Sequence, residues 1–361
     1  MSDRGLAILL ALGAAVVVVH LLTGGRYGLH RDELATLDDA RHLAWGYVAY
    51  PPVTPFFGWL SLKLFGTSLT GFRFFASVSV SVAVVLTGLM ARELGGRTGA
   101  QAIAASAAIP FALGAGSLMQ YVAFDYLAWV VCSYFFVRLC RSHDPRWWLA
   151  IGACVGLGML TKYSMVVCAF AIATGALFTD LRADLRSKWL WLGVAASLLI
   201  FLPNLLWQIQ NHFVSLDFLR HIHDRDVRIG RTKNFLPDQL KLTLFTFPLA
   251  IVGLWFYLAS KTGPVFSSGR IFVRDSADYF PRCQGSRLLP RSGLSAFVCR
   301  RSSFSSRNDY APAPGLAPFT GVVCVGFCCG NDLYRCGVPC SADASWFRLG
   351  APDVQGQRRL P

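Results

Sequence analysis

The sequence predicts an all-α, polytopic membrane protein, and three observations favour this class. Of its 361 residues, 54% are hydrophobic and only 15% are charged, whereas soluble proteins carry about a quarter charged residues. The mean hydropathy is +0.46. Apolar runs of roughly 20 residues recur along the chain, and each is long enough to cross a hydrocarbon core of about 30 Å. In such a protein, the formal charge of +14 indicates cytoplasmic loops and lipid contacts rather than nucleic acid.

Eight segments before residue 265 are predicted to span the bilayer. In chain order they are residues 5–23, 72–90, 101–119, 121–139, 147–160, 163–178, 189–206 and 240–259. The first is too long for the core of a signal peptide and lacks a cleavage site, so we expect it to be retained. The fifth and sixth are short, which is typical of a broken or tilted pair. Gly152, Gly156 and Gly158 predict close helix packing.

Charge predicts the orientation of these spans. The short loops are basic, with arginine or lysine at 92, 97, 138, 141, 146, 182, 186, 188 and 261. Since basic loops favour the cytoplasm, the N-terminus is predicted inside. Residues 24–71 and 207–239 then form two external loops. The first includes an apolar, aromatic stretch at 56–65, which is predicted to lie in the membrane interface.

The composition changes near residue 264. Residues 265–361 hold twelve arginines but no lysine, six aspartates but no glutamate, and seven of the eleven cysteines. An odd cysteine number without regular spacing fits neither a disulfide domain nor a zinc module. Residues 287–302, read one base later, can encode a segment containing Leu-Ala-Pro-Ala-Tyr-Pro. We therefore interpret residues 1–264 as one membrane domain and 265–361 as a frameshifted tail, which we expect to be disordered.

An ordered set of motifs precedes that change. The first external loop reads RYGLHRDEL at 26–34 and continues as ARHLAWGYVAYPP at 40–52. Later motifs are ARELGG at 91–96, FDYLAW at 124–129, GMLTKYS at 158–164 and PNLLWQ at 203–208. This series resembles membrane glycosyltransferases of family 39, which include protein O-mannosyltransferases and the aminoarabinose transferase of lipid A. The resemblance covers nearly all of residues 20–260, and the shifted tail segment matches a late motif of the same family.

The resemblance implies a fold and a reaction. The fold would be the large membrane fold called GT-C. The reaction would be inverting transfer of a hexose-like sugar, as in mannosyltransferases, from a polyprenyl-phosphate donor to a lipid, glycan or protein hydroxyl. The resemblance implies that it takes place on the outer face of the cytoplasmic membrane. No nucleotide cofactor is implied, because the lipid phosphate activates the sugar; a divalent metal is one option. A transporter or flippase of lipid-linked sugars, and an inactive truncated fragment, are the alternatives.

Asp32 and Glu33 are the predicted catalytic residues. Sugar transfer needs a base to take the proton of the acceptor hydroxyl, and a carboxylate just outside the first span can meet both donor and acceptor. The resemblance assigns this role to Asp32, with Glu33 as a supporting acid. The alternative is that the pair caps or solvates a loop helix.

Five other residues are candidate substrate-binding residues. Asp125 lies one turn inside a span, where an ionisable residue is expensive; it would bind acceptor, donor phosphate or metal, or form a buried ion pair with Lys162. Lys162 would neutralise the donor phosphate or extend to the membrane interface. Arg31 and Tyr163 belong to the same motifs. Arg220, in the basic loop 207–239, would bind the leaving phosphate or belong to a solvated charged loop.

Overall fold

The structure is a computed structural model and describes residues 3–177, 180–230 and 237. The predicted span 240–259, the tail 265–361 and the end of the second external loop lie outside these residues. Within the described part the secondary structure is helical throughout, with no strand. Five helices are long and apolar enough to cross a membrane. They are α1 (Asp3–Thr23), α5 (Phe74–Glu93), α6 (Thr98–Ala115), α7 (Tyr121–Ser142) and α10 (Lys188–Gln210).

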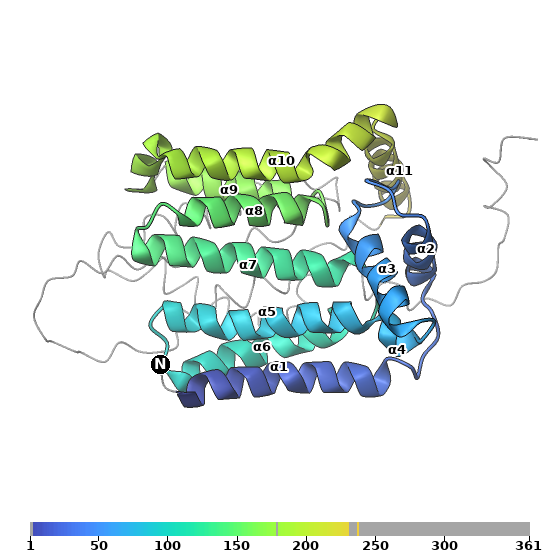
Figure 1. The fold of residues 1–361 in the computed structure, drawn as a ribbon, viewed down its shortest axis with the longest axis horizontal. Coiled ribbons are helices and arrows are strands. Elements are labelled where there is room, and N and C mark those ends of the chain that lie inside the picture. Colours follow the sequence, from blue (N-terminus) through green and yellow to red (C-terminus); the bar gives the residue numbers. More distant parts are fainter. Residues whose placement is uncertain (1–2, 178–179, 231–236, 238–361) are drawn as a thin grey trace, which may run out of the picture.

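Two shorter apolar helices occupy the fifth and sixth predicted spans. They are α8 (Trp147–Met159) and α9 (Met165–Leu177). Each predicted span within the described residues therefore coincides with a helix. In the bundle, α5 packs against α1, α6 and α7, while α8 lies between α7 and α10 (Figure 1).

The packing of α8 against α10 depends on glycine. A Cβ atom on Gly152 would lie only 2.0 Å from the carbonyl oxygen of Gly193, so the two backbones touch. Gly156 faces the backbone of Ser197 in the same way, and Gly158 faces Met165. The close packing predicted at these glycines is thus present. Helices in membranes associate through such small residues, since lipid offers no hydrophobic driving force for their assembly.

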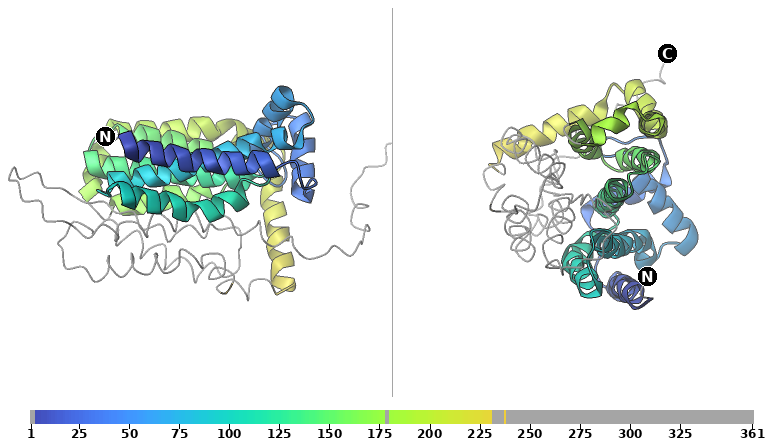
Figure 2. Two further views of the ribbon diagram at one scale, coloured as in Figure 1. Left: turned by 90° about the horizontal axis from the view of Figure 1, so that it is seen from below. Right: turned by 90° about the vertical axis from the view of Figure 1, so that its left-hand side faces the viewer.

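The two ends of the bundle differ in content. At the first, which we call the site end, lie α2 (Arg31–Arg41), α3 (Val53–Phe65), α4 (Leu69–Phe72) and α11 (Val214–Arg228) (Figure 1). At the opposite end, which we call the basic end, lie the N-terminus of α1 and the basic short loops, including the 3-10 helix η1 (Asp180–Arg186) (Figure 2). The two segments predicted as external loops therefore share one end.

Both segments predicted as external loops contain helices. The apolar stretch at 56–65 is part of α3, as expected, and Phe57 stacks on Phe124 of α7 with ring centroids 4.9 Å apart. The second loop begins later than predicted, because α10 continues to Gln210 and α11 follows after a short turn. Pro203 lies inside α10, and the helix bends toward its C-terminal part (Figure 1), as proline permits.

Candidate active site

Glu33 forms a buried ion pair with Arg73, a residue that the motifs do not include. The glutamate is 0% exposed and the arginine 2%. Arg73 Nε donates to Glu33 Oε1 at 2.7 Å, and its Nη2 donates to Oε2, which is the bidentate geometry that guanidinium favours. The backbone N–H of Met119 and that of His30 also donate to the carboxylate, at 2.9 and 3.0 Å. Both oxygens of Glu33 thus accept hydrogen bonds from protein groups.

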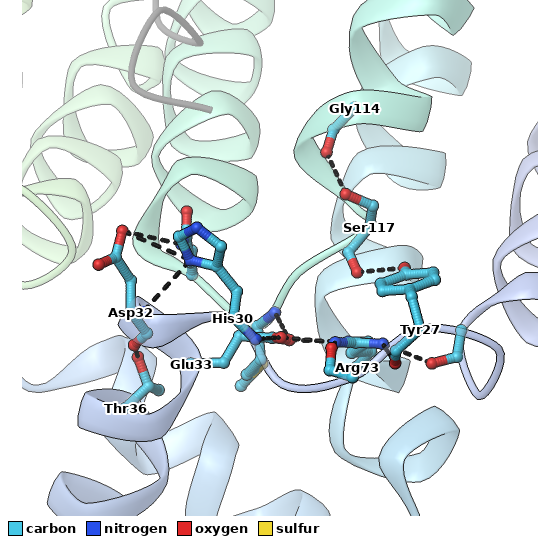
Figure 3. A network of polar contacts seen from close by, with 12 residues as sticks. Tyr27, His30, Asp32, Glu33, Thr36, Arg73, Gly114 and Ser117 are labelled. Carbon is cyan, nitrogen blue, oxygen red and sulfur yellow. Dashed lines mark hydrogen bonds and ion pairs between the residues drawn. The ribbon is translucent and has the colours of Figure 1, made fainter. Parts of the chain in front are cut away.

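Arg73 also organises the loop that leads into α2. Its guanidinium donates to the carbonyl oxygens of Gly24, Tyr27 and Gly28, and it lies 4.1 Å from the centroid of the Tyr27 ring. The Tyr27 hydroxyl in turn donates to the Ser117 carbonyl at 2.6 Å (Figure 3). The first turn of α2 is therefore anchored to α5 and to the turn between α6 and α7. These contacts make Glu33 a structural anchor of α2, and its role as a supporting acid stays a prediction.

Asp32 is that neighbour, and its side chain is 44% exposed. It lies in the first turn of α2. The N-cap residue of this helix, His30, forms a capping box with Glu33. Gln120 Nε2 donates to Asp32 Oδ2 at 3.3 Å, and Arg31 Nε lies 3.2 Å from Oδ1. Arg31 itself is 79% exposed. The predicted base is accordingly accessible, next to a cation, on a rigid support. The capping alternative applies to Glu33, while the Asp32 side chain is half-exposed and contacts Gln120.

The start of α7 connects Asp32 with the predicted substrate-binding residues Asp125 and Lys162. Lys162 Nζ lies 3.9 Å from Asp125 Oδ2 and 4.8 Å from the centroid of the Tyr121 ring. Asp125 is 1% exposed, so the buried ion pair that we gave as one alternative is present. Residues 119–125 thus contact Glu33 through Met119, Asp32 through Gln120 and Lys162 through Tyr121 and Asp125.

Tyr163 belongs to a polar network that holds the 42–50 segment against α10. Its hydroxyl donates to Asn204 Oδ1 at 3.2 Å and accepts from Gln208 Nε2 at 2.7 Å. Asn204 Nδ2 also donates to the Trp45 carbonyl at 2.7 Å. A Cβ on Gly46 would lie 2.3 Å from the Trp207 ring. The role of Tyr163 in substrate binding stays a prediction, and its contacts show how the motif at 203–208 supports the external loop.

A second carboxylate lies on the same face of α2. Asp39 accepts a hydrogen bond of 2.6 Å from the Tyr50 hydroxyl, and Tyr50 is buried with only 8% exposure. Burial raises the pKa of the Asp39 carboxyl, and the bond from Tyr50 opposes that rise. Burial and the hydrogen bond to Asp39 both raise the pKa of Tyr50. The ring centroids of Tyr50 and Tyr121 lie 6.0 Å apart, and Tyr121 in turn contacts Lys162. Tyr50 therefore links α2 to Lys162.

Arg220 is not brought to this site by any contact that the structure describes. It lies on α11, its side chain is 77% exposed, and its Nη1 is 3.3 Å from Asp217 Oδ1. Arg225 likewise pairs with Asp226 at 3.2 Å. The exposed Arg220–Asp217 pair matches the solvated, charged alternative, whereas Asp226 is buried. Phosphate binding by Arg220 remains a prediction. In the described part of the chain, histidine, cysteine and carboxylate side chains form no group of three or more that could hold a metal ion.

Three residues of the site were missed by sequence reasoning. They are Arg73, Gln120 and Asp39. A signal existed for Arg73, since it is a cation at the external edge of a span, against the usual charge bias. Gln120 and Asp39 carry no comparable signal, because their roles depend on which helices meet.

The bundle and its site end define a multi-pass helical membrane protein with the GT-C fold. The crystal structure of ArnT from Cupriavidus metallidurans bound to undecaprenyl phosphate superimposes with a TM-score of 0.55 at 16% identity, and the match covers 93% of this chain and 61% of that one. At this identity the likeness concerns the fold.

Sequence comparisons define the relationship further. The family described as dolichyl-phosphate-mannose-protein mannosyltransferase matches residues 49–207. The lipopolysaccharide core galacturonosyltransferase RgtB of Rhizobium johnstonii is 27% identical over 225 residues, which are 60% of this chain and 44% of that protein. The chain thus spans less than half the length of this curated relative. Together these matches confirm the resemblance to family 39 glycosyltransferases.

Proposed function

We propose that the protein is a glycosyltransferase of the cytoplasmic membrane that transfers a sugar from a polyprenyl-phosphate donor to a hydroxyl group outside the membrane. One observation carries the proposal: residues 119–125 contact both the Asp32 end of α2 and the Lys162 turn. The site end therefore combines an accessible carboxylate with a lysine that contacts the same short segment. Transfer from a lipid phosphate needs both a base and a cation for the phosphate.

In the proposed reaction, Asp32 accepts the proton of the acceptor hydroxyl. The hydroxyl oxygen attacks the anomeric carbon of the sugar, the bond from that carbon to the phosphate oxygen breaks, and polyprenyl phosphate leaves from the opposite face. The products are a glycoside of inverted configuration and free polyprenyl phosphate, and the proton on Asp32 returns to water. General bases of this kind contribute about 10² to 10⁴-fold to rate.

Lys162 and Arg31 are proposed to bind the donor phosphate. Lys162 is 24% exposed, and its ammonium group is fixed between the buried Asp125 and the face of Tyr121. A lysine held in this way can place its charge against phosphate oxygens without a large loss of side-chain entropy. Arg31 lies beside Asp32 at the surface and offers a guanidinium fork for the same group.

The comparisons support a lipid-linked donor and leave several sugars as candidates. The related ArnT structure contains undecaprenyl phosphate, whereas the matched family and RgtB are described by mannose and galacturonate respectively. We propose a hexose-like sugar, and a lipid, glycan or protein as acceptor.

The test uses the full chain in membrane vesicles with radiolabelled polyprenyl-phosphate mannose, galacturonate and aminoarabinose. The proposal predicts that one donor yields free polyprenyl phosphate and a labelled, covalently glycosylated acceptor in equal amounts. Lys162→Gln should raise the KM for the donor, whereas Lys63→Gln, a change in α3 away from this contact, should not. Movement of intact donor across the vesicle without a glycoside would favour the flippase alternative and refute the transferase.

A further inference from the structure

A charged cavity lies at the basic end, where α5 and α7 finish. Its volume is about 550 Å³, and its described lining consists of Arg92, Glu93, Arg138, Arg141 and Ser142. Glu93 is 7% exposed. Its carboxylate accepts from Arg138 at 3.0 Å and from Arg141 at 2.6 Å, and lies 3.3 Å from an Arg92 nitrogen. Nothing in the proposed transfer reaction uses this group.

The described lining carries more positive than negative charge, since one carboxylate faces three guanidinium groups. The arginines also remain partly accessible, with side-chain exposures of 33% for Arg92, 35% for Arg138 and 56% for Arg141. A guanidinium has five N–H donors, and each of these three donates one hydrogen bond to Glu93. Glu93 therefore holds the arginines together without cancelling their charge.

Aromatic residues place this cavity at the depth of lipid headgroups. Helix α8 begins at Trp147 and α10 at Lys188, next to Trp189. Arg138 lies 5.0 Å from the centroid of the Trp147 ring, and Lys188 Nζ lies 5.5 Å from that of Trp189. Tryptophan is enriched where a helix passes from hydrocarbon to headgroups, which favours headgroup depth for the cavity lined by α5 and α7.

We propose that this cavity binds the phosphodiester headgroup of an anionic phospholipid from the leaflet at the basic end. Basic pockets between membrane helices at a bilayer surface bind such headgroups, and several guanidinium groups match phosphate oxygens. The buried Glu93 sets their spacing, which makes the site specific rather than a general basic surface.

The experiment titrates the full chain in phosphatidylcholine nanodiscs with fluorescent phosphatidylglycerol. We expect saturable binding that is weakened about fivefold by Arg141→Gln, the effect of one basic residue at a membrane surface. The control is Arg182→Gln, which removes an exposed charge from η1 at the same end but outside the cavity lining; it should leave affinity unchanged.

A second pair of variants avoids breaking the ion pairs. Ser142 is exposed and lines the cavity, so Ser142→Asp should weaken phosphatidylglycerol binding by at least about fivefold, while Ser142→Asn should not. Equal effects of Arg141→Gln and Arg182→Gln, or equal binding of fluorescent phosphatidylcholine, would overturn the proposal. Full competition by inorganic phosphate would also overturn it, because the occupant would then be a free anion and not a lipid.

Discussion

Replacing Arg73 by methionine should destabilise the fold strongly. The substitution leaves the 0% exposed carboxylate of Glu33 without its cation, and breaking a buried ion pair from one side costs about 3–5 kcal/mol. It also removes the donors to the carbonyl oxygens of Gly24, Tyr27 and Gly28. We therefore expect the free energy of unfolding to fall by at least ~3 kcal/mol.

Two further variants separate charge from geometry. Arg73→Lys keeps the charge but not the fork that reaches both oxygens of Glu33, so we expect a smaller loss of about 1–3 kcal/mol. In the double variant Glu33→Met with Arg73→Met, no charge is left buried, and part of the stability lost in Arg73→Met should return. The stability regained in the double variant would measure the coupling between Glu33 and Arg73.

The assay is unfolding of the purified, detergent-solubilised full chain by sodium dodecyl sulfate, followed by tryptophan fluorescence. Arg182→Met, on the exposed surface of η1, is the matched control and should change the free energy by less than about 0.5 kcal/mol. If Arg73→Met were no more destabilising than this control, the buried ion pair would not be what anchors α2, and our account of Glu33 would be wrong.

Three other variants test separate parts of the structure. Gly152→Ala places a Cβ 2.0 Å from the backbone of α10 and should destabilise the chain by about 1–3 kcal/mol in the same unfolding assay. Gly99→Ala in α6, where the added Cβ would meet no described atom of another part of the chain within 4 Å, should not. Burial raises the pKa of Asp39 above its ordinary value of 3.8, so the stability that its protonated form contributes is complete below pH 3.8 and is lost as the pH rises through the native pKa. The melting temperature of Asp39→Asn, measured relative to wild type, should therefore rise with pH over this range. A difference that stays constant with pH would contradict this. Gln120→Leu removes a donor to Asp32 and should lower kcat by up to about 10²-fold with little change in KM; an unchanged kcat in steady-state assays would exclude a positioning role.

Much of the fold could be predicted from the sequence because membrane spans depend on local composition. The apolar runs at 5–23 and 189–206 end within a few residues of α1 and α10. The short runs at 147–160 and 163–178 also became short helices. Orientation of the basic loops toward one end followed from charge. The extension of α10 to Gln210 was missed, because local hydropathy falls at the polar Gln208. Its hydrogen bonds to Tyr163 and Ser215 depend on the tertiary fold and not on the local sequence.

The candidate site was predictable only in part. Motif resemblance pointed to Asp32, and the structure places its side chain at an accessible position. The resemblance assigned the base to Asp32 and a supporting place to Glu33, but the ion pair of Glu33 with Arg73 was not predictable. Adjacent residues on a helix point in different directions, and only the fold decides which of them meets Arg73. Lys162 and Asp125 were expected as a possible pair, and that pair is present.

The measurement that tests the central claim most directly compares sugar transfer by Asp32→Asn and Asp38→Asn in the same membranes. Both changes remove one carboxylate from α2, but Asp38 is 78% exposed beside His42 and takes no part in the proposed chemistry. Our account predicts that Asp32→Asn lowers kcat by about 10² to 10⁴-fold while the donor still binds, and that Asp38→Asn transfers sugar at the wild-type rate. Undiminished transfer by Asp32→Asn would contradict the assignment of Asp32 as the base.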